Sequence, residues 1–222
     1  MLRDQFNCYE NKDMIAIIDY NAGNLTSVAR AVNHLGFKCV ITNDTKEISK
    51  AERIIFPGVG AAGSAMESIK RLGLDQAIRD ALLSGKPILG ICLGTQIIME
   101  YSEENNTDCI GIIGGKVLSF RFDKNNNSES GLKIPHMGWN SVLLQKKHFV
   151  LSGLKDNDEF YFVHGFYPAT NDDSHIIGTT THGISFASII GFENIIATQF
   201  HPEKSGRPGL AILNNFCVWK PC

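Results

Sequence analysis

The run Met14-Ile-Ala-Ile-Ile-Asp19 predicts the first central strand of the fold. Its apolar residues are continuous rather than alternating, which is typical of a parallel β-strand that is covered on both faces. Directly after it, apolar residues recur at helical spacing from Leu25 to Leu35, with Asn24 placed to cap this helix and Gly36 to end it. A strand followed by a helix predicts the first unit of an α/β fold.

The same alternation continues along the first half of the chain. Strands are predicted at Lys38–Ile41, Arg53–Phe56 and Pro87–Ile91, with helical segments between Ser64 and Leu83. Strands that alternate with helices need crossover connections, so we expect a central, mostly parallel sheet with flanking helices. Beyond Tyr101, shorter runs predict a mixed or antiparallel extension of the sheet and a closing helix: Glu159–Val163, Ile176–Thr181, Ile195–Phe200 and the helix Gly209–Val218.

Composition and length are those of one globular domain. The chain has 222 residues, of which 43% are hydrophobic and 20% charged. We predict an N-terminal extension over residues 1–13, one domain over residues 14–222, and a mobile surface loop within Asp123–Gly131. The formal net charge of -2 gives no basic field for nucleic acid. The apolar runs are too short to cross a membrane and no signal peptide is visible, so we expect a cytoplasmic protein.

Cysteines and histidines are scattered along the chain, without the close spacing of metal ligands. No metal and no organic cofactor is therefore expected. Five of the six cysteines are interpreted as structural, reduced thiols: Cys8, Cys39, Cys109, Cys217 and Cys222.

The sixth cysteine, Cys92, lies in Pro87-Ile-Leu-Gly-Ile-Cys-Leu-Gly-Thr-Gln96. A strand, a cysteine between Gly90 and Gly94, and then a helix containing Ile97, Ile98 and Met99 form the layout of a nucleophile elbow. Small neighbours allow the sharp turn that exposes the central side chain, and the helix N-terminus favours a thiolate. The amide of Leu93 would point toward a developing oxyanion. A lone cysteine is more often a small core residue, so this pattern needs support from elsewhere.

That support comes from Ala197-Thr-Gln-Phe-His-Pro-Glu203. A thiol needs a base to hold its proton, and the base needs an acceptor to fix its orientation. His201 and Glu203 fit these two roles, since Pro202 keeps the backbone extended and lets both side chains project to one side. Alone, a His-x-Glu pair would be interpreted as a polar strand end.

The third element is the glycine-rich segment Phe56-Pro-Gly-Val-Gly60. An amide near Val59 or Gly60 could complete an oxyanion hole with Leu93. A phosphate-binding loop is the competing interpretation, but the segment lacks the glycine spacing and the lysine of such loops.

Together these segments resemble the class I, or triad, glutamine amidotransferases, and more closely the glutaminase subunits of imidazole glycerol phosphate synthase. The closer match is carried by six segments: Ile18–Leu25, Pro57–Gly60, Gly90–Gln96, Pro135–Asn140, Tyr161–His164 and Gln199–Ser205. The resemblance implies a flavodoxin-like fold and hydrolysis of glutamine to glutamate and ammonia through a thioester on Cys92. It also implies transfer of the ammonia to a cyclase subunit in a heterodimer of histidine biosynthesis, with Gln96 and Glu104 holding the amino-acid groups of glutamine.

The resemblance further implies that seven residues face the cyclase: Pro135, His136, Met137, Trp139, Asn140, Tyr161 and Lys204. His164 would support the structure or the glutamine site. The remaining histidines, His34, His148, His175 and His182, are expected to be surface residues without a chemical partner. In this family a peptide flip at Val59 would switch the oxyanion hole, and with it the rate, when the partner binds its substrate.

Three alternatives remain open from the sequence. A paralogous glutaminase could serve another synthase, such as one that aminates surface-polysaccharide sugars, and Ser119–Lys133 is the stretch where such a difference could lie. A regulatory subunit that kept the fold is disfavoured by the complete set of Cys92, His201 and Glu203. A cysteine protease or α/β-hydrolase is disfavoured by the Pro57–Gly60 segment.

Overall fold

The computed structural model describes residues 14–122, 132–156 and 158–221. The extension predicted over residues 1–13 and the loop predicted within residues 123–131 lie outside these ranges. Within them, no helix is long and apolar enough to cross a membrane.

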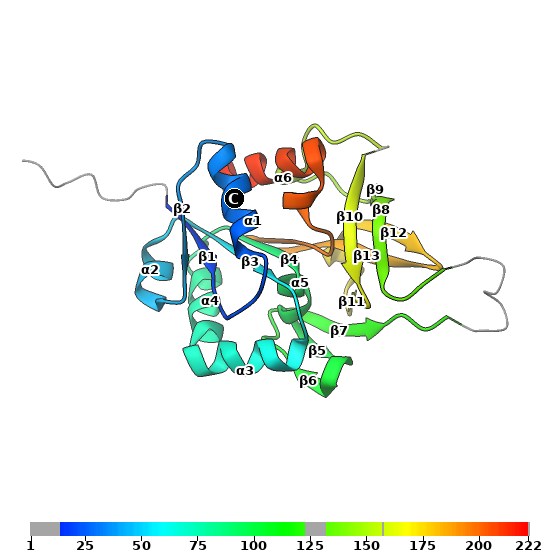
Figure 1. The fold of residues 1–222 in the computed structure, drawn as a ribbon, viewed down its shortest axis with the longest axis horizontal. Helices are drawn as coiled ribbons and strands as arrows, with labels where there is room; N and C mark the ends of the chain where they lie inside the picture. The colour runs from blue at the N-terminus through cyan, green and yellow to red at the C-terminus, as the bar shows by residue number, and fades with distance from the viewer. Residues whose placement is uncertain (1–13, 123–131, 157, 222) are drawn as a thin grey trace, which may run out of the picture.

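A sheet of eight strands forms the centre of the molecule (Figure 1). Its order is β2-β1-β3-β4-β14-β13-β12-β9, with parallel pairing from β2 to β14 and antiparallel pairing from β14 to β9. The strands are β1 (Ile15–Ile18), β2 (Cys39–Thr42), β3 (Arg53–Gly58), β4 (Ile88–Cys92), β9 (Leu143–Leu144), β12 (Ile176–His182), β13 (Ile184–Phe192) and β14 (Ile195–Thr198). The predicted mostly parallel sheet and its antiparallel extension are confirmed.

Two smaller sheets flank the antiparallel end. One pairs β8 (His136–Ser141) with β10 (Glu159–His164). The other has the order β11-β7-β5-β6, and its strands are β5 (Met99–Ser102), β6 (Thr107–Asp108), β7 (Ile113–Ser119) and β11 (Phe166–Thr170). Since β10 and β11 are separated by Gly165 alone, one short segment connects the two small sheets.

Helices cover both faces of the central sheet. In Figure 1, α1 (Leu25–His34) and α6 (Gly206–Val218) lie on one face, and α3 (Ala62–Leu72) and α4 (Leu74–Leu83) on the other. The short helices are α2 (Thr45–Lys50) and α5 (Leu93–Ile97). Burial follows the expected helical spacing in α1, where Leu25, Val28 and Val32 face the core.

Two local predictions need correction. Asn24 precedes α1, but its side chain makes no capping hydrogen bond and the residue is left-handed, with φ 74°. Its side-chain amide instead donates to Glu203. The helix after Cys92 is also shorter than predicted, because α5 ends at Ile97 and Met99 already begins β5.

Candidate active site

Cys92 ends β4 in a strained turn. Its backbone has φ 52° and ψ -104°, a region that non-glycine residues rarely occupy and that is concentrated at functional sites. A Cβ on Gly94 would lie 1.8 Å from the carbonyl oxygen of Phe56, and one on Gly90 would lie 2.8 Å from the Cβ of Ala197. Both flanking glycines are therefore required by close packing, Gly94 against backbone and Gly90 against the Ala197 side chain, as the sequence predicts for an elbow.

The turn opens into a cavity of about 290 Å³. β3 runs parallel to β4 with Gly58 opposite Cys92, which brings the end of β3 to the rim of the same cavity. All residues predicted for the oxyanion hole and for substrate binding line it. The full lining is Val59, Gly60, Cys92, Leu93, Gln96, Glu104, Pro135, Val163, His164, Gly165 and Phe166.

The second element, His201 and Glu203, forms a buried pair. The His201 Nδ1 lies 2.8 Å from the Glu203 Oε1, and the two side chains are 1% and 0% exposed. The backbone of His201 is held from both sides, because its amide donates to the Tyr161 carbonyl and the Ser205 hydroxyl donates to its own carbonyl. The predicted pairing of these two residues is confirmed by this geometry.

The charge of this pair is set by its surroundings. Burial alone would lower the pKa of His201, but interactions with Cys92 and Glu203 outweigh burial and raise the pKa to about 10. The Nε2 of His201 has no hydrogen-bond partner within 3.5 Å among the described residues, although the neighbouring Cys92 raises the pKa of the ring. An imidazolium with a free Nε2 is suited to donate a proton to a leaving group.

Asn24 also reaches the buried pair, a contact that local sequence patterns do not predict. Its Nδ2 donates to the Glu203 Oε1 at 2.6 Å, although the two residues lie 179 positions apart. The same carboxylate oxygen of Glu203 therefore accepts hydrogen bonds from both His201 and Asn24, which fixes the plane of the carboxylate. Asn24 lies in a segment quoted for the family resemblance, but local spacing suggests only a helix cap.

We expect Asn24→Gly to lower kcat by about tenfold or more, with little change in KM, because a hydrogen bond to a charged group is lost. Glycine tolerates the left-handed backbone, so the turn should survive. Asn21→Gly is the matched control, since Asn21 is also left-handed, with φ 68°, and is exposed. Equal glutaminase rates for the two variants would contradict a role for Asn24.

Comparison with known proteins agrees with this geometry. The profile of the class-I glutamine amidotransferase family matches residues 16–219. The chain is 49% identical over 206 residues to the imidazole glycerol phosphate synthase subunit HisH of Nitratidesulfovibrio vulgaris, covering 93% of this chain and 97% of that one. The chain belongs to the class-I glutamine amidotransferases, in the HisH family.

A second HisH subunit and a solved structure are also similar to this amidotransferase. The HisH subunit of Neisseria gonorrhoeae is 43% identical over 210 residues, covering 92% of this chain and 99% of that one. Among solved structures, PurLQS from Thermotoga maritima superimposes with a TM-score of 0.70 at 19% identity, covering 92% of this chain and 97% of that one. At 19% identity the similarity to PurLQS concerns the fold alone, and it confirms the amidotransferase architecture.

Gln96 and Glu104 line the cavity of this amidotransferase, and each side chain is held by a hydrogen bond to a backbone group. The Gln96 Nε2 donates to the Phe166 carbonyl at 3.0 Å. The Glu104 Oε2 accepts from the Ala62 amide at 2.8 Å, next to the glycine-rich turn at Gly60. One oxygen of each side chain is thus left to face a ligand, and an ammonium group is the complementary partner.

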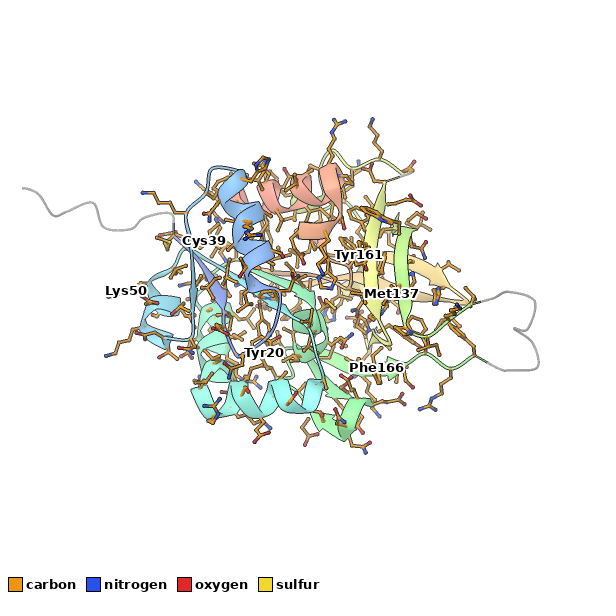
Figure 2. All side chains as sticks on the ribbon, in the orientation of Figure 1. Tyr20, Cys39, Lys50, Met137, Tyr161 and Phe166 are labelled. Carbon is orange, nitrogen blue, oxygen red and sulfur yellow. The ribbon has the colours of Figure 1, made fainter. Side chains whose placement is uncertain are left out.

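The residues predicted to face a partner form a surface beside the cavity, with one exception. Trp139 and Met137 are 54% and 63% exposed, and Met137 and Tyr161 lie on the adjoining strands β8 and β10 (Figure 2). The Trp139 and Tyr161 rings meet edge-on at 6.1 Å, and the Lys204 Nζ lies 5.9 Å from the Tyr161 ring. We call Met137, Trp139, Tyr161 and Lys204 the aromatic surface; Pro135 is exposed and Asn140 half-buried beside it.

His136 is the exception, because its side chain is only 4% exposed. Its Nδ1 lies 3.0 Å from the His164 Nε2, and its ring stacks on His182 with centroids 4.1 Å apart. The expectation that His182 lacks a partner is therefore wrong. It is also wrong for His148, whose ring lies 4.9 Å from that of Trp219, and for His175, whose ring lies 5.1 Å from that of Phe192. His136 supports the strand that carries Trp139 rather than presenting its own ring. Alternation along β8 explains the burial, since His136 lies one residue from the exposed Met137.

The buried histidines predict a loss of stability in acid. Burial is the largest cause of a lowered pKa in both residues. The pKa falls from the usual 6.5 to about 4 for His136 and to about 3 for His164. The unfolded chain therefore binds protons that the folded chain excludes, and stability falls as the pH drops from about 6.5 toward about 3. Urea unfolding measured across this range should show a steep slope for the wild type and a shallower one for His164→Gln. His34→Gln changes an exposed ring and should keep the wild-type slope.

No group of three or more metal-ligating side chains occurs among the residues that the structure describes. The free thiols of Cys39, Cys109 and Cys217 lie away from the cavity lining.

Proposed function

We propose that Cys92, His201 and Glu203 hydrolyse glutamine through a thioester and that the ammonia passes to a cyclase subunit. The family assignment supplies the reaction: the chain is a glutamine amidotransferase, and as a HisH subunit it is the glutaminase of imidazole glycerol phosphate synthase. The observation that carries the catalytic proposal is the strained Cys92 turn beside a buried His201–Glu203 pair.

The first half-reaction forms the thioester. The Cys92 thiolate attacks the side-chain carbonyl carbon of glutamine, and the carbonyl oxygen becomes an oxyanion. The amide of Leu93, first in α5, and an amide of the Val59–Gly60 turn are the proposed donors to that oxyanion. His201 gives its Nε2 proton to the nitrogen as the carbon–nitrogen bond breaks, which releases ammonia.

The second half-reaction restores the Cys92 thiolate. His201, now neutral, takes a proton from water, and the resulting hydroxide attacks the thioester carbon. The carbon–sulfur bond breaks, glutamate leaves, and the imidazolium and thiolate are restored. Glu203, held by Asn24, keeps His201 Nδ1 protonated and oriented throughout. No metal or organic cofactor enters either step.

Gln96 and Glu104 are proposed to hold the α-amino group of glutamine. Both line the cavity, and in both the anchored atom faces the protein. The Glu104 contact to Ala62 also ties substrate binding to the turn that carries Val59 and Gly60. In this proposal, a turn of the Val59 peptide supplies or withdraws an oxyanion donor and changes the rate by roughly a hundredfold to a thousandfold.

The aromatic surface is proposed to contact the cyclase. Exposed tryptophan and methionine with a neighbouring tyrosine are the composition of interface centres. We also propose a cytoplasmic location, where the Cys92 thiol stays reduced, and one catalytic domain over residues 14–222 after an extension over residues 1–13.

Trp139→Ala tests the partner assignment. We expect about tenfold or weaker binding to the histidine-pathway cyclase by calorimetry, since interface tryptophans often contribute at this level. Leu83→Ala is the control. Leu83 is also a large exposed apolar side chain, at 83% exposure, but it lies on α4 and outside the aromatic surface. Tight, Trp139-independent binding would place the cyclase elsewhere, and no binding would point to a different synthase.

A further inference from the structure

Gln199 is fully buried directly after β14, two residues before His201. Its backbone amide donates to the Ser188 carbonyl at 2.9 Å, which fixes the residue against β13. The side chain extends under the elbow, where its Nε2 lies 3.8 Å from the Cys92 Sγ as a hydrogen-bond donor. Neither the family resemblance nor the catalytic scheme above assigns it a role.

The orientation of the Gln199 amide follows from its neighbours. The Gln96 Nε2 donates both to the Phe166 carbonyl at 3.0 Å and to the Gln199 Oε1 at 3.1 Å. Because the Gln199 oxygen accepts from Gln96, its nitrogen must be the end that faces the sulfur. Phe166, Gln96, Gln199 and Cys92 thus form one hydrogen-bonded chain, which we call the amide chain.

A buried amide normally finds partners, so satisfied hydrogen bonds alone do not indicate function. What distinguishes Gln199 is that its partner is the sulfur of the elbow. A neutral thiol is a weak acceptor, whereas a thiolate is a strong one, so the hydrogen bond strengthens when Cys92 ionises. Gln96, the next member of the amide chain after Gln199, lines the cavity and is available to a ligand.

We propose that Gln199 is a positioning residue for Cys92. Its amide holds the sulfur in place, stabilises the thiolate, and connects it through Gln96 to the occupant of the cavity. The proposal rests on Cys92 being the nucleophile. No new covalent step is involved, since Gln199 only donates a hydrogen bond to the sulfur.

The test is the pH dependence of Cys92 alkylation by iodoacetamide in the full chain, followed at the Cys92 peptide by mass spectrometry. Gln199→Met keeps the length of the side chain and removes the N–H donor. We expect alkylation about tenfold slower near neutral pH and a half-maximal rate at higher pH, because a hydrogen bond to a charged group is lost. In the complex, kcat should fall with KM nearly unchanged.

Ser188→Ala is the matched control. Ser188 is fully buried beside Gln199, and its hydroxyl accepts from Thr180 without reaching the sulfur. Its alkylation profile should equal that of the wild type. If Gln199→Met does not fold, Gln199→Glu replaces it: an anion beside the sulfur should slow alkylation further.

A Gln199→Met or Gln199→Glu profile that coincides with the wild type in a folded chain would overturn the proposal. Cys92→Ser separates this result from a failure of the catalytic assignment. Loss of turnover in Cys92→Ser with unchanged alkylation in the Gln199 variants rejects only the role of Gln199. Full turnover in Cys92→Ser rejects the nucleophile itself, and the proposal with it.

Discussion

Cys92→Ala is expected to lower glutaminase activity in the activated complex by about 10⁵-fold or more, the scale seen when a nucleophile is removed from a coupled triad. The loss should be almost entirely in kcat, because Gln96 and Glu104 remain to bind glutamine. Ammonia release and glutamate release should fall together, since both follow the same thioester.

The fold should survive this substitution. Cys92 is 6% exposed and small, so alanine removes only one buried atom. Cys109→Ala is the matched control, because Cys109 is a half-buried free thiol outside the cavity lining. Cys109→Ala should keep wild-type activity. Turnover by Cys92→Ala within tenfold of that control would contradict the mechanism.

Gly94→Ala is expected to give the largest loss of stability among single methyl additions near the site. The added Cβ would lie 1.8 Å from the carbonyl oxygen of Phe56 and 2.9 Å from the carbonyl carbon of the same residue. Backbone cannot rotate away as a side chain can, so β3 and the elbow must separate. We expect a destabilisation of about 3 kcal/mol or more, together with loss of glutaminase activity.

Gly114→Ala provides the control for Gly94→Ala. In β7, a Cβ on Gly114 would meet its nearest atom, the Asn171 Nδ2, at an ordinary 3.6 Å. Urea unfolding should show Gly114→Ala close to the wild type and Gly94→Ala far below it. Similar unfolding midpoints for all three proteins would show that the elbow is less tightly packed than the structure describes.

The parts of the fold that local patterns control are predictable from the sequence. The buried run at β1, the glycines around Cys92 and the His-x-Glu pair each need only neighbours within a few residues, and the structure places all three as expected. Their convergence on one cavity follows from parallel topology, in which the carboxyl ends of the strands meet on one edge.

The parts that depend on distant contacts could not be predicted in this way. Asn24 reaches Glu203 across 179 positions, and no spacing rule connects them. His136 and His182 stack because β8 packs on β12, so their burial depends on tertiary packing between sheets. Gln199 lies in a segment that carries the family resemblance. Its contact to the Cys92 sulfur, however, depends on the register between β14 and β4.

The most direct test of a Cys92-dependent glutaminase coupled to a cyclase is ammonia and glutamate release from glutamine by this chain, measured alone and with the histidine-pathway cyclase carrying its ribonucleotide substrate. We expect slow release by the chain alone and a rise of roughly a hundredfold or more with the loaded cyclase, and we expect this rise to be lost in Cys92→Ala. Release that is independent of Cys92, or unchanged by the loaded cyclase, would contradict the proposed function.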